Sequence, residues 1–130
     1  MKNFFIYILL SFFLNFNSYA EWTEMSKNVS GDTLYFDRQT LKIVGDKRYF
    51  LYMQDYTVPS EYGDLSSRSY RELNCSNMMF KDLIKDYFSL PLARGSKTEG
   101  SGPIKDPKWR KNRSGSSGET LNIKVCKIKN

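Results

Sequence analysis

The chain has two cysteines and no histidine among its 130 residues, so few kinds of chemistry are open to it. The lack of histidine excludes Ser-His and Cys-His nucleophile pairs, imidazole proton shuttles and most zinc sites. Catalysis by carboxylates alone would need a working pair of acids. Asp82 and Asp86 stand four residues apart beside Lys81 and Lys85, and we predict that they are solvated surface charges. We therefore expect no catalytic residues, no bound metal and no cofactor.

Cys75 and Cys126 are expected to form a disulfide bond. Residues 1–20 have the pattern of an export signal, and an exported protein meets an oxidising environment, in which two thiols normally pair. The bond would close a loop of about 50 residues and stabilise the fold by roughly 4 kcal/mol in the chain-entropy model. The alternative is a pair of buried free cysteines. A reactive thiol is not expected, because nothing nearby in the sequence could activate it.

A basic segment from Ala93 to Arg113 is the other group of residues that could bind a ligand. It carries seven basic and two acidic side chains, whereas the rest of residues 21–130 is balanced in charge. Its glycines and prolines predict a long exposed connection. Concentrated positive charge attracts anionic partners, with strong salt dependence. The candidate ligand-binding residues are Arg94, Lys97, Lys105, Lys108, Trp109, Arg110, Lys111 and Arg113.

Trp109 can be interpreted in two ways. Between Lys108 and Arg110 its ring could stack on a sugar or an aromatic group; alternatively, it packs back onto the core beside a solvated basic segment. Nucleic acid is not expected as a partner, because an exported protein rarely meets it and no other aromatic residue is interleaved with these basic residues.

Residues 1–20 have the pattern of a signal peptide, and residues 21–130 that of one folded domain. Lys2 supplies the positive start, Phe4–Phe16 is largely apolar, and Ser18–Ala20 offers small residues for cleavage. The apolar run is shorter than the ~20 residues that a membrane span needs, although an uncleaved anchor is the alternative. No cysteine stands at the cleavage site, so we expect an exported protein without a lipid anchor, located in the periplasm, on the cell surface or outside the cell.

Strand patterns dominate residues 21–130. They predict strands at Thr33–Asp37 and Ser66–Cys75, and a hairpin of Leu41–Val44 and Arg48–Tyr56 that turns at Gly45–Asp46. Both faces of the second hairpin strand are apolar or aromatic, which is typical of a strand at the centre of a covered sheet. A homodimer is expected if a helix covers only one of these faces.

Two further segments fit both helix and strand. In 77–88, apolar residues recur at helical spacing. Near the C-terminus, Ser116 and Glu119 have the spacing of a capping box, and apolar residues follow at helical spacing. An alternating strand pattern over Leu121–Val125 fits nearly as well. If the helix forms, Cys126 lies on its last turn and the disulfide ties that helix to the sheet.

Several landmarks are spread over essentially all of residues 21–130: Trp22, Tyr35-Phe36-Asp37, Asp55-Tyr56, Ser66-Ser67, Asn74-Cys75, Trp109 and Val125-Cys126. In their order and spacing, these landmarks resemble the surface-adhesin protein E family. The resemblance implies an α+β, mainly β fold, in which an antiparallel sheet of about five to six strands carries a C-terminal helix tethered by the cysteine pair. It also places Lys81–Tyr87 on a strand, so we predict a strand over 77–88.

The resemblance implies a non-enzymatic, adhesin-like binding module of bacterial origin. Its partners would be host matrix or plasma proteins or an anionic glycan, bound through the basic segment. The alternative is a small periplasmic inhibitor or accessory protein that binds a partner enzyme. A lysozyme is disfavoured as that enzyme, because two basic proteins repel each other.

Overall fold

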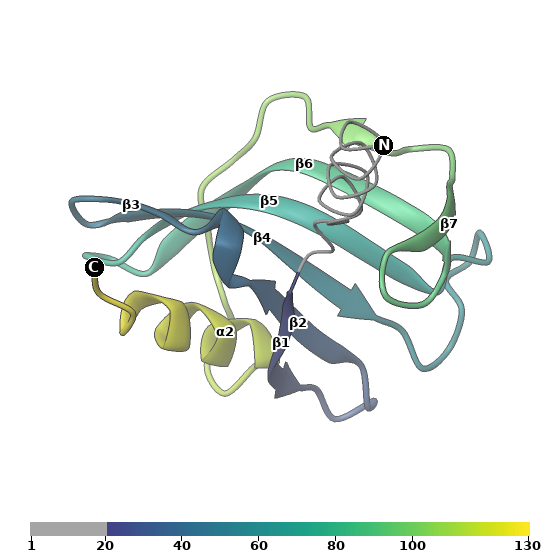
Figure 1. Cartoon of the computed structure of the whole chain (residues 1–130), viewed down its shortest axis with the longest axis horizontal. Helices are drawn as coiled ribbons and strands as arrows, with labels where there is room; N and C mark the ends of the chain where they lie inside the picture. Colours follow the sequence, from purple (N-terminus) through teal and green to yellow (C-terminus); the bar gives the residue numbers. More distant parts are fainter. Residues whose placement is uncertain (1–20) are drawn as a thin grey trace, which may run out of the picture.

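The computed structural model describes residues 21–130, and the signal peptide predicted for residues 1–20 lies outside this range. One antiparallel sheet carries a single described helix against one face (Figure 1). Its strands follow the order β1-β2-β4-β5-β6-β7, while β3 pairs with β4, and β8 and β9 pair with β6. The elements are β1 (Trp22–Lys27), β2 (Thr33–Asp37), the 3-10 turn η1 (Arg38–Thr40), β3 (Lys42–Val44), β4 (Lys47–Asp55), β5 (Ser66–Asn74), β6 (Met79–Leu90), β7 (Arg94–Lys97), β8 (Gly102–Pro103), β9 (Arg110–Lys111) and α2 (Ser117–Cys126).

The predicted hairpin is confirmed as β3 and β4. Val44 pairs with Lys47, and Gly45 between them has a φ of +58°, which a residue with a side chain rarely adopts. On its other side β4 pairs with β5 along all nine residues of both strands. Since β2 and β5 flank it, β4 has the central position that its two apolar faces predicted.

Residues Met79–Leu90 form β6, which confirms the strand predicted for 77–88. The helical spacing of its apolar residues has a structural cause. Asp82 pairs with Arg71 and Ile84 with Tyr70, so Leu83 is an extra residue without a partner of its own. Such a bulge shifts the alternation of side chains by one residue. The sequence of β6 therefore mimics a helical period while the chain stays extended.

The C-terminal segment is a helix, as its capping pattern indicated. The Ser116 hydroxyl accepts a hydrogen bond from the Glu119 N–H (3.2 Å), and the Glu119 carboxylate accepts one from the Gly115 N–H (3.1 Å). Leu121 and Val125 are fully buried and fix which face of α2 meets the sheet. The helix interpretation therefore holds, and the strand alternative is wrong.

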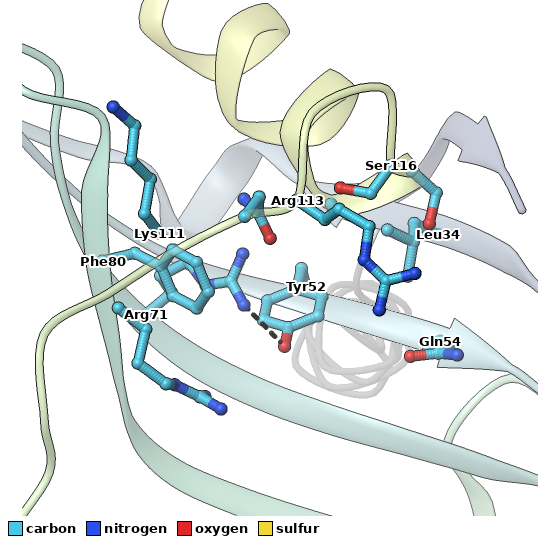
Figure 2. Close-up of a pocket in the computed structure, with 12 residues that line it drawn as sticks. Leu34, Tyr52, Gln54, Arg71, Phe80, Lys111, Arg113 and Ser116 are labelled. Atoms are coloured by element: carbon cyan, nitrogen blue, oxygen red, sulfur yellow. Dashed lines mark hydrogen bonds between the residues drawn. The ribbon is translucent and has the colours of Figure 1, made fainter.

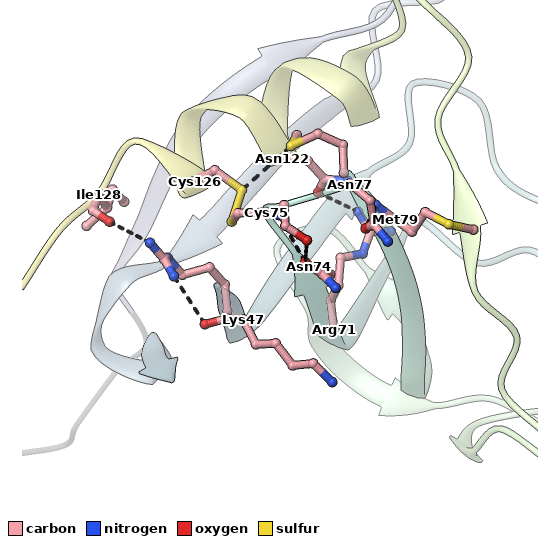
Figure 3. The surroundings of a disulfide bond; sticks show 12 residues. Lys47, Arg71, Asn74, Cys75, Asn77, Met79, Asn122, Cys126 and Ile128 are labelled. Carbon is pink, nitrogen blue, oxygen red and sulfur yellow. Dashed lines mark hydrogen bonds between the residues drawn. A yellow bond between two sulfur atoms is a disulfide. The ribbon is translucent and has the colours of Figure 1, made fainter. Parts of the chain in front are cut away.

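The core lies between α2 and the sheet. The disulfide joins Cys75, just after β5, to Cys126 on the last turn of α2, with Cα atoms 5.7 Å apart (Figure 3). Arg48 donates a hydrogen bond to the Ile128 carbonyl (3.4 Å) and so holds the chain beyond the helix. The predicted tether is thus confirmed. The buried apolar residues of this core are Met25, Leu34, Phe36, Phe50, Tyr52, Leu73, Phe80, Leu121 and Val125.

The basic segment is exposed, as predicted, but it is not an open loop. It runs along β6 and pairs with it three times, through β7, β8 and β9. Strand edges readily pair with other chains, and these short strands occupy the edge of β6 within the molecule. The segment is consequently tethered at three points, which fixes where its charges lie.

Candidate functional site

Three of the candidate ligand-binding residues, Arg110, Lys111 and Arg113, lie around an open cavity of about 400 Å³ (Figure 2). We call this cavity the cationic cleft. Adjacent strands supply its floor, and its walls come from 110–113 and from Ser116–Gly118 at the start of α2. No lining residue among those described is acidic. The floor residues are Leu34 on β2, Tyr52 and Gln54 on β4, Arg71 on β5 and Phe80 on β6.

Arg71 is buried beneath the cleft and holds several elements together. Its guanidinium donates to both oxygens of Asp82 (2.8 and 3.2 Å), to the Tyr52 hydroxyl (2.9 Å) and to the Asn122 amide oxygen (3.1 Å). It also lies 3.8 Å from the ring centroid of Phe80 and 4.2 Å from that of Tyr52. A buried charge needs this full set of partners to offset its lost hydration. The network therefore fixes the position of the cleft floor relative to α2.

The Tyr52 hydroxyl is both donor and acceptor in this network. Burial raises its pKa; the Arg71 charge opposes that shift and the Asp82 charge adds to it, leaving the pKa above its usual value. The hydroxyl thus stays protonated at neutral pH, donates to Asp82 (3.1 Å) and accepts from Arg71.

Asp82 and Asp86 are not solvated surface charges, and that prediction was wrong. Each is buried and pairs with an arginine across the β5–β6 ladder, Asp82 with Arg71 and Asp86 with Arg68. The bulge at Leu83 turns Asp82 toward α2 and Asp86 toward the other face of the sheet. Two carboxylates on opposite faces cannot act together on one substrate.

The cleft has an excess of positive charge. The Arg110 guanidinium comes only within 3.7 Å of Asp82, the carboxylate that Arg71 already uses. Burial lowers the pKa of the nearby Lys85; Asp82 partly opposes this shift, and Arg110 and Arg71 lower the pKa further. Arg113 has no ion pair within the described part of the chain. The Asp82 carboxylate is thus shared by Arg71, Arg110 and Lys85, so its one negative charge is outnumbered.

The wall residues point in different directions. Arg113 reaches over the cavity toward Tyr52 and Gln54, whereas Lys111 extends away from it (Figure 2). Gly118 allows the wall to close against the helix, because a Cβ there would lie 2.5 Å from the Asn112 amide oxygen. Arg110 and Arg113 are therefore the two guanidiniums best placed to meet a ligand.

The sequence profile of the surface-adhesin protein E family matches residues 22–127. The chain belongs to this family. Solved structures of Haemophilus influenzae protein E have a similar fold. Crystal form II gives a TM-score of 0.62 at 15% identity over 85% of this chain and 90% of that one. A selenomethionine form gives 0.60 at 18% identity over 85% and 88%. Protein E from a non-typeable strain gives 0.57 at 15% identity over 85% and 78%. No curated protein matches the sequence.

In this adhesin E family member, Trp109 lies outside the cleft. Its ring is 38% exposed, and the ammonium groups of Lys47 and Lys81 lie 5.4 and 4.7 Å from its centroid. Both lysines pair with Glu72, at 2.9 and 3.6 Å. Trp109 is thus not packed in the core, and its exposed ring contacts the two lysines. Its cation–π contacts anchor the basic segment to the helix-free face just before Arg110.

The other candidates are also away from the cleft. Arg94 and Lys97 lie on β7, where Lys97 pairs with Asp86 at 3.2 Å. Lys105 is exposed between β8 and β9, and Lys108 makes a weak, exposed pair with Asp106. Three of the eight predicted residues therefore share one site.

Sequence reasoning missed the floor of the site. Arg71 occupies an inward position of β5 between Ser69 and Leu73, both of which are buried. An arginine on the core side of an alternating strand needs a buried partner, and this was the available signal. Within residues 21–130 no group of three or more cysteine or acidic side chains could hold a metal ion. No helix in that range is long and apolar enough to cross a membrane.

Proposed function

We propose that this protein is an exported, non-enzymatic binding module that holds anionic partners in the cationic cleft. Membership of an adhesin family over residues 22–127 supports a binding protein rather than an enzyme. The observation that carries the proposal is the meeting of Arg110, Lys111 and Arg113 at an open cavity whose described lining includes no acid. The partners are host matrix or plasma proteins, or the anionic glycans attached to them.

The tethering of the basic segment supports this role. Residues 110–113 are held by the β9 pairing on one side and by the start of α2 on the other. Because the backbone is held in this way, less conformational entropy is lost when a ligand binds. The exposed charges also attract anionic partners from a distance and are screened by salt.

The proposal includes export of the protein from the cytoplasm. Removal of residues 1–20 as a signal peptide would leave Glu21 as the first residue, directly before β1. Mass spectrometry of the protein recovered outside the cytoplasm tests this, and a mass that includes residues 1–20 would contradict cleavage.

A homodimer is part of the proposal, because α2 covers only one face of the sheet. On the other face Leu51, Tyr70 and Ile84 line an open cavity of about 440 Å³. Burying such apolar surface against a second copy is favourable. Sedimentation equilibrium tests this, and a monomer mass at every concentration would contradict it.

The test of the binding role compares two sets of substitutions that remove equal charge. Binding of heparin and of immobilised matrix proteins is measured over a range of salt concentrations. We expect binding to weaken with salt and to be largely lost when Arg110, Lys111 and Arg113 are all replaced by Gln. The matched control replaces Arg94, Lys105 and Lys108 by Gln and retains binding. Equal losses in the two variants would show that only net charge matters, and co-purification with one stoichiometric periplasmic enzyme would favour an inhibitor instead.

A further inference from the structure

We infer that the cationic cleft binds a single acidic sugar unit, with its carboxylate or sulfate held between the guanidiniums of Arg110 and Arg113. This inference rests on the proposed function and specifies its ligand. The cavity of about 400 Å³ lies within the ~300–1,000 Å³ typical of small-ligand sites. It therefore fits one unit of a glycan, not a long stretch of polymer.

The charges of the cleft favour one oxyanion. Arg71 is already satisfied by Asp82, Tyr52 and Asn122. Within residues 21–130 the Arg110 guanidinium has a 3.7 Å contact with the same carboxylate and lies 5.4 Å from the Phe80 ring centroid, so it retains free N–H donors. A guanidinium binds an oxyanion through two parallel N–H groups, which is stronger and more directional than a contact with lysine. An incoming carboxylate or sulfate thus meets donors that the protein has not used.

The rest of the lining matches a sugar ring. Sugar hydroxyls need both donors and acceptors, and the amides of Gln54 and Asn112 and the hydroxyl of Ser117 supply them. The C–H groups of a sugar pack on apolar surface, and Leu34, Tyr52 and Phe80 supply the apolar part of the floor, with Arg71 stacked against the two rings. A few polar groups around an apolar floor fix the orientation of a small ligand.

The local topology disfavours an extended acidic peptide. Such a peptide binds most readily by adding a strand to a free sheet edge. Beside the cleft the edge of β6 is already paired with β9, with Phe80 opposite Arg110 and Met79 opposite Lys111. A peptide could use only its side chains here, whereas a compact sugar acid needs no strand pairing.

The test is an NMR titration of the processed protein with small probes. The probes are methyl glucuronide, glucose 6-sulfate, the neutral methyl glucoside, and a capped peptide of three glutamates. We expect both acidic sugars to shift the resonances of Gln54, Asn112 and Gly118, and to bind at least about tenfold more tightly than the neutral glucoside, because a charge-assisted hydrogen bond contributes about 1.5–3 kcal/mol. Arg113→Gln should weaken them by about tenfold or more, whereas Arg94→Gln should leave the affinity unchanged.

Several results would overturn the inference: equal binding of the neutral glucoside, tighter binding of the peptide, shifts that map elsewhere, or equal effects of Arg113→Gln and Arg94→Gln. Both substitutions lie on the exposed surface, and an unchanged thermal midpoint excludes misfolding. Failure of the inference is distinguishable from failure of the proposed function. Heparin and matrix binding that requires the cleft arginines, without sugar binding, would refute only the inference. Sugar binding in the cleft without any glycan or matrix binding would refute the adhesin role.

Discussion

Strands β5 and β6 carry two cross-strand Arg–Asp pairs, one on each face of the sheet. Arg71 and Asp82 face α2, with side chains only 5% and 4% exposed. Arg68 and Asp86 lie on the helix-free face, which we call the open face, with side chains 32% and 10% exposed. The residue types and the strands are the same, and both pairs are in register. The two pairs differ in what covers them.

The presence of α2 over only one of the two pairs changes the role of that pair. Under α2 the Arg71 guanidinium exchanges water for Asp82, Tyr52 and Asn122, and every partner is needed because a buried unpaired charge is costly. On the open face the buried Asp86 carboxylate has two cationic partners, Arg68 and Lys97, which are themselves partly exposed to solvent, so no single contact is critical. On one face the arginine of the pair thereby forms part of the floor of the cationic cleft, and on the other face the pair remains a contact with partly exposed cations.

The largest effect is expected for Asp82→Ala. This substitution leaves Arg71 buried without its counter-ion and should lower the free energy of unfolding by about 3–5 kcal/mol. Urea unfolding followed by circular dichroism measures the loss. The double variant Arg71→Met with Asp82→Leu removes both charges and should be more stable than Asp82→Ala alone. If the double variant is less stable than Asp82→Ala, the unpaired buried charge of Arg71 is not the cause of the loss of stability in Asp82→Ala.

Removal of the disulfide should have the next largest effect. Replacing Cys75 and Cys126 together by Ser should lower the free energy of unfolding by about 2–4 kcal/mol, since the cross-link restricts the unfolded chain. Because α2 covers only the Arg71 face, hydrogen exchange should rise in α2 more than in β6. Equal increases in the two elements would contradict the view that the bond mainly holds the helix.

Tyr52→Phe tests the hydroxyl of the buried network. The substitution removes the donor to Asp82 and the acceptor for Arg71, while the ring stays in place. We expect a loss of about 1.5–2 kcal/mol, the usual contribution of a hydrogen bond to a charged group. The matched control is Tyr49→Phe on the open face, where the hydroxyl donates to Glu72 at 3.3 Å. A loss in the control as large as in Tyr52→Phe would show that cover by α2 does not matter.

The same contrast explains what the sequence could reveal. The hairpin, the central strand and the capping box depend on local patterns, and these were predictable. The cysteine pair was also predictable, because an exported chain with two cysteines leaves one possible bond. The buried Arg71 network was not, because the bulge at Leu83, which places Asp82 and Asp86 on opposite faces, depends on the pairing with β5. The place of Arg113 was likewise hidden, because charge density gives the sign of a surface and not its shape.

Asp86→Ala should have a small effect. The cations that lose their partner, Arg68 and Lys97, are partly exposed and can be hydrated instead, so the free energy of unfolding should fall by less than about 1 kcal/mol. The measurement is the same urea unfolding used for Asp82→Ala. Equal losses of unfolding free energy in Asp86→Ala and Asp82→Ala would show that cover by α2 does not change the contribution of an Arg–Asp pair.

The smallest effect concerns pH and Glu72, which lies on the open face. Burial raises the pKa of Glu72, but the hydrogen bond and charge of Lys47, with help from Lys81, outweigh it and hold the pKa below the usual 4.5. A carboxylate whose pKa is lowered in the folded state stabilises the protein at pH values above its pKa in the unfolded chain. This contribution is lost as the pH falls through the folded pKa.

The fall in unfolding free energy from pH 7 to pH values well below 4.5 should therefore be smaller in Glu72→Gln than in the natural protein. The difference should be under about 1 kcal/mol, because both lysines remain partly solvated. An unchanged acid dependence in Glu72→Gln would mean that other carboxylates govern acid unfolding, and that the ion pairs of the open face contribute nothing measurable.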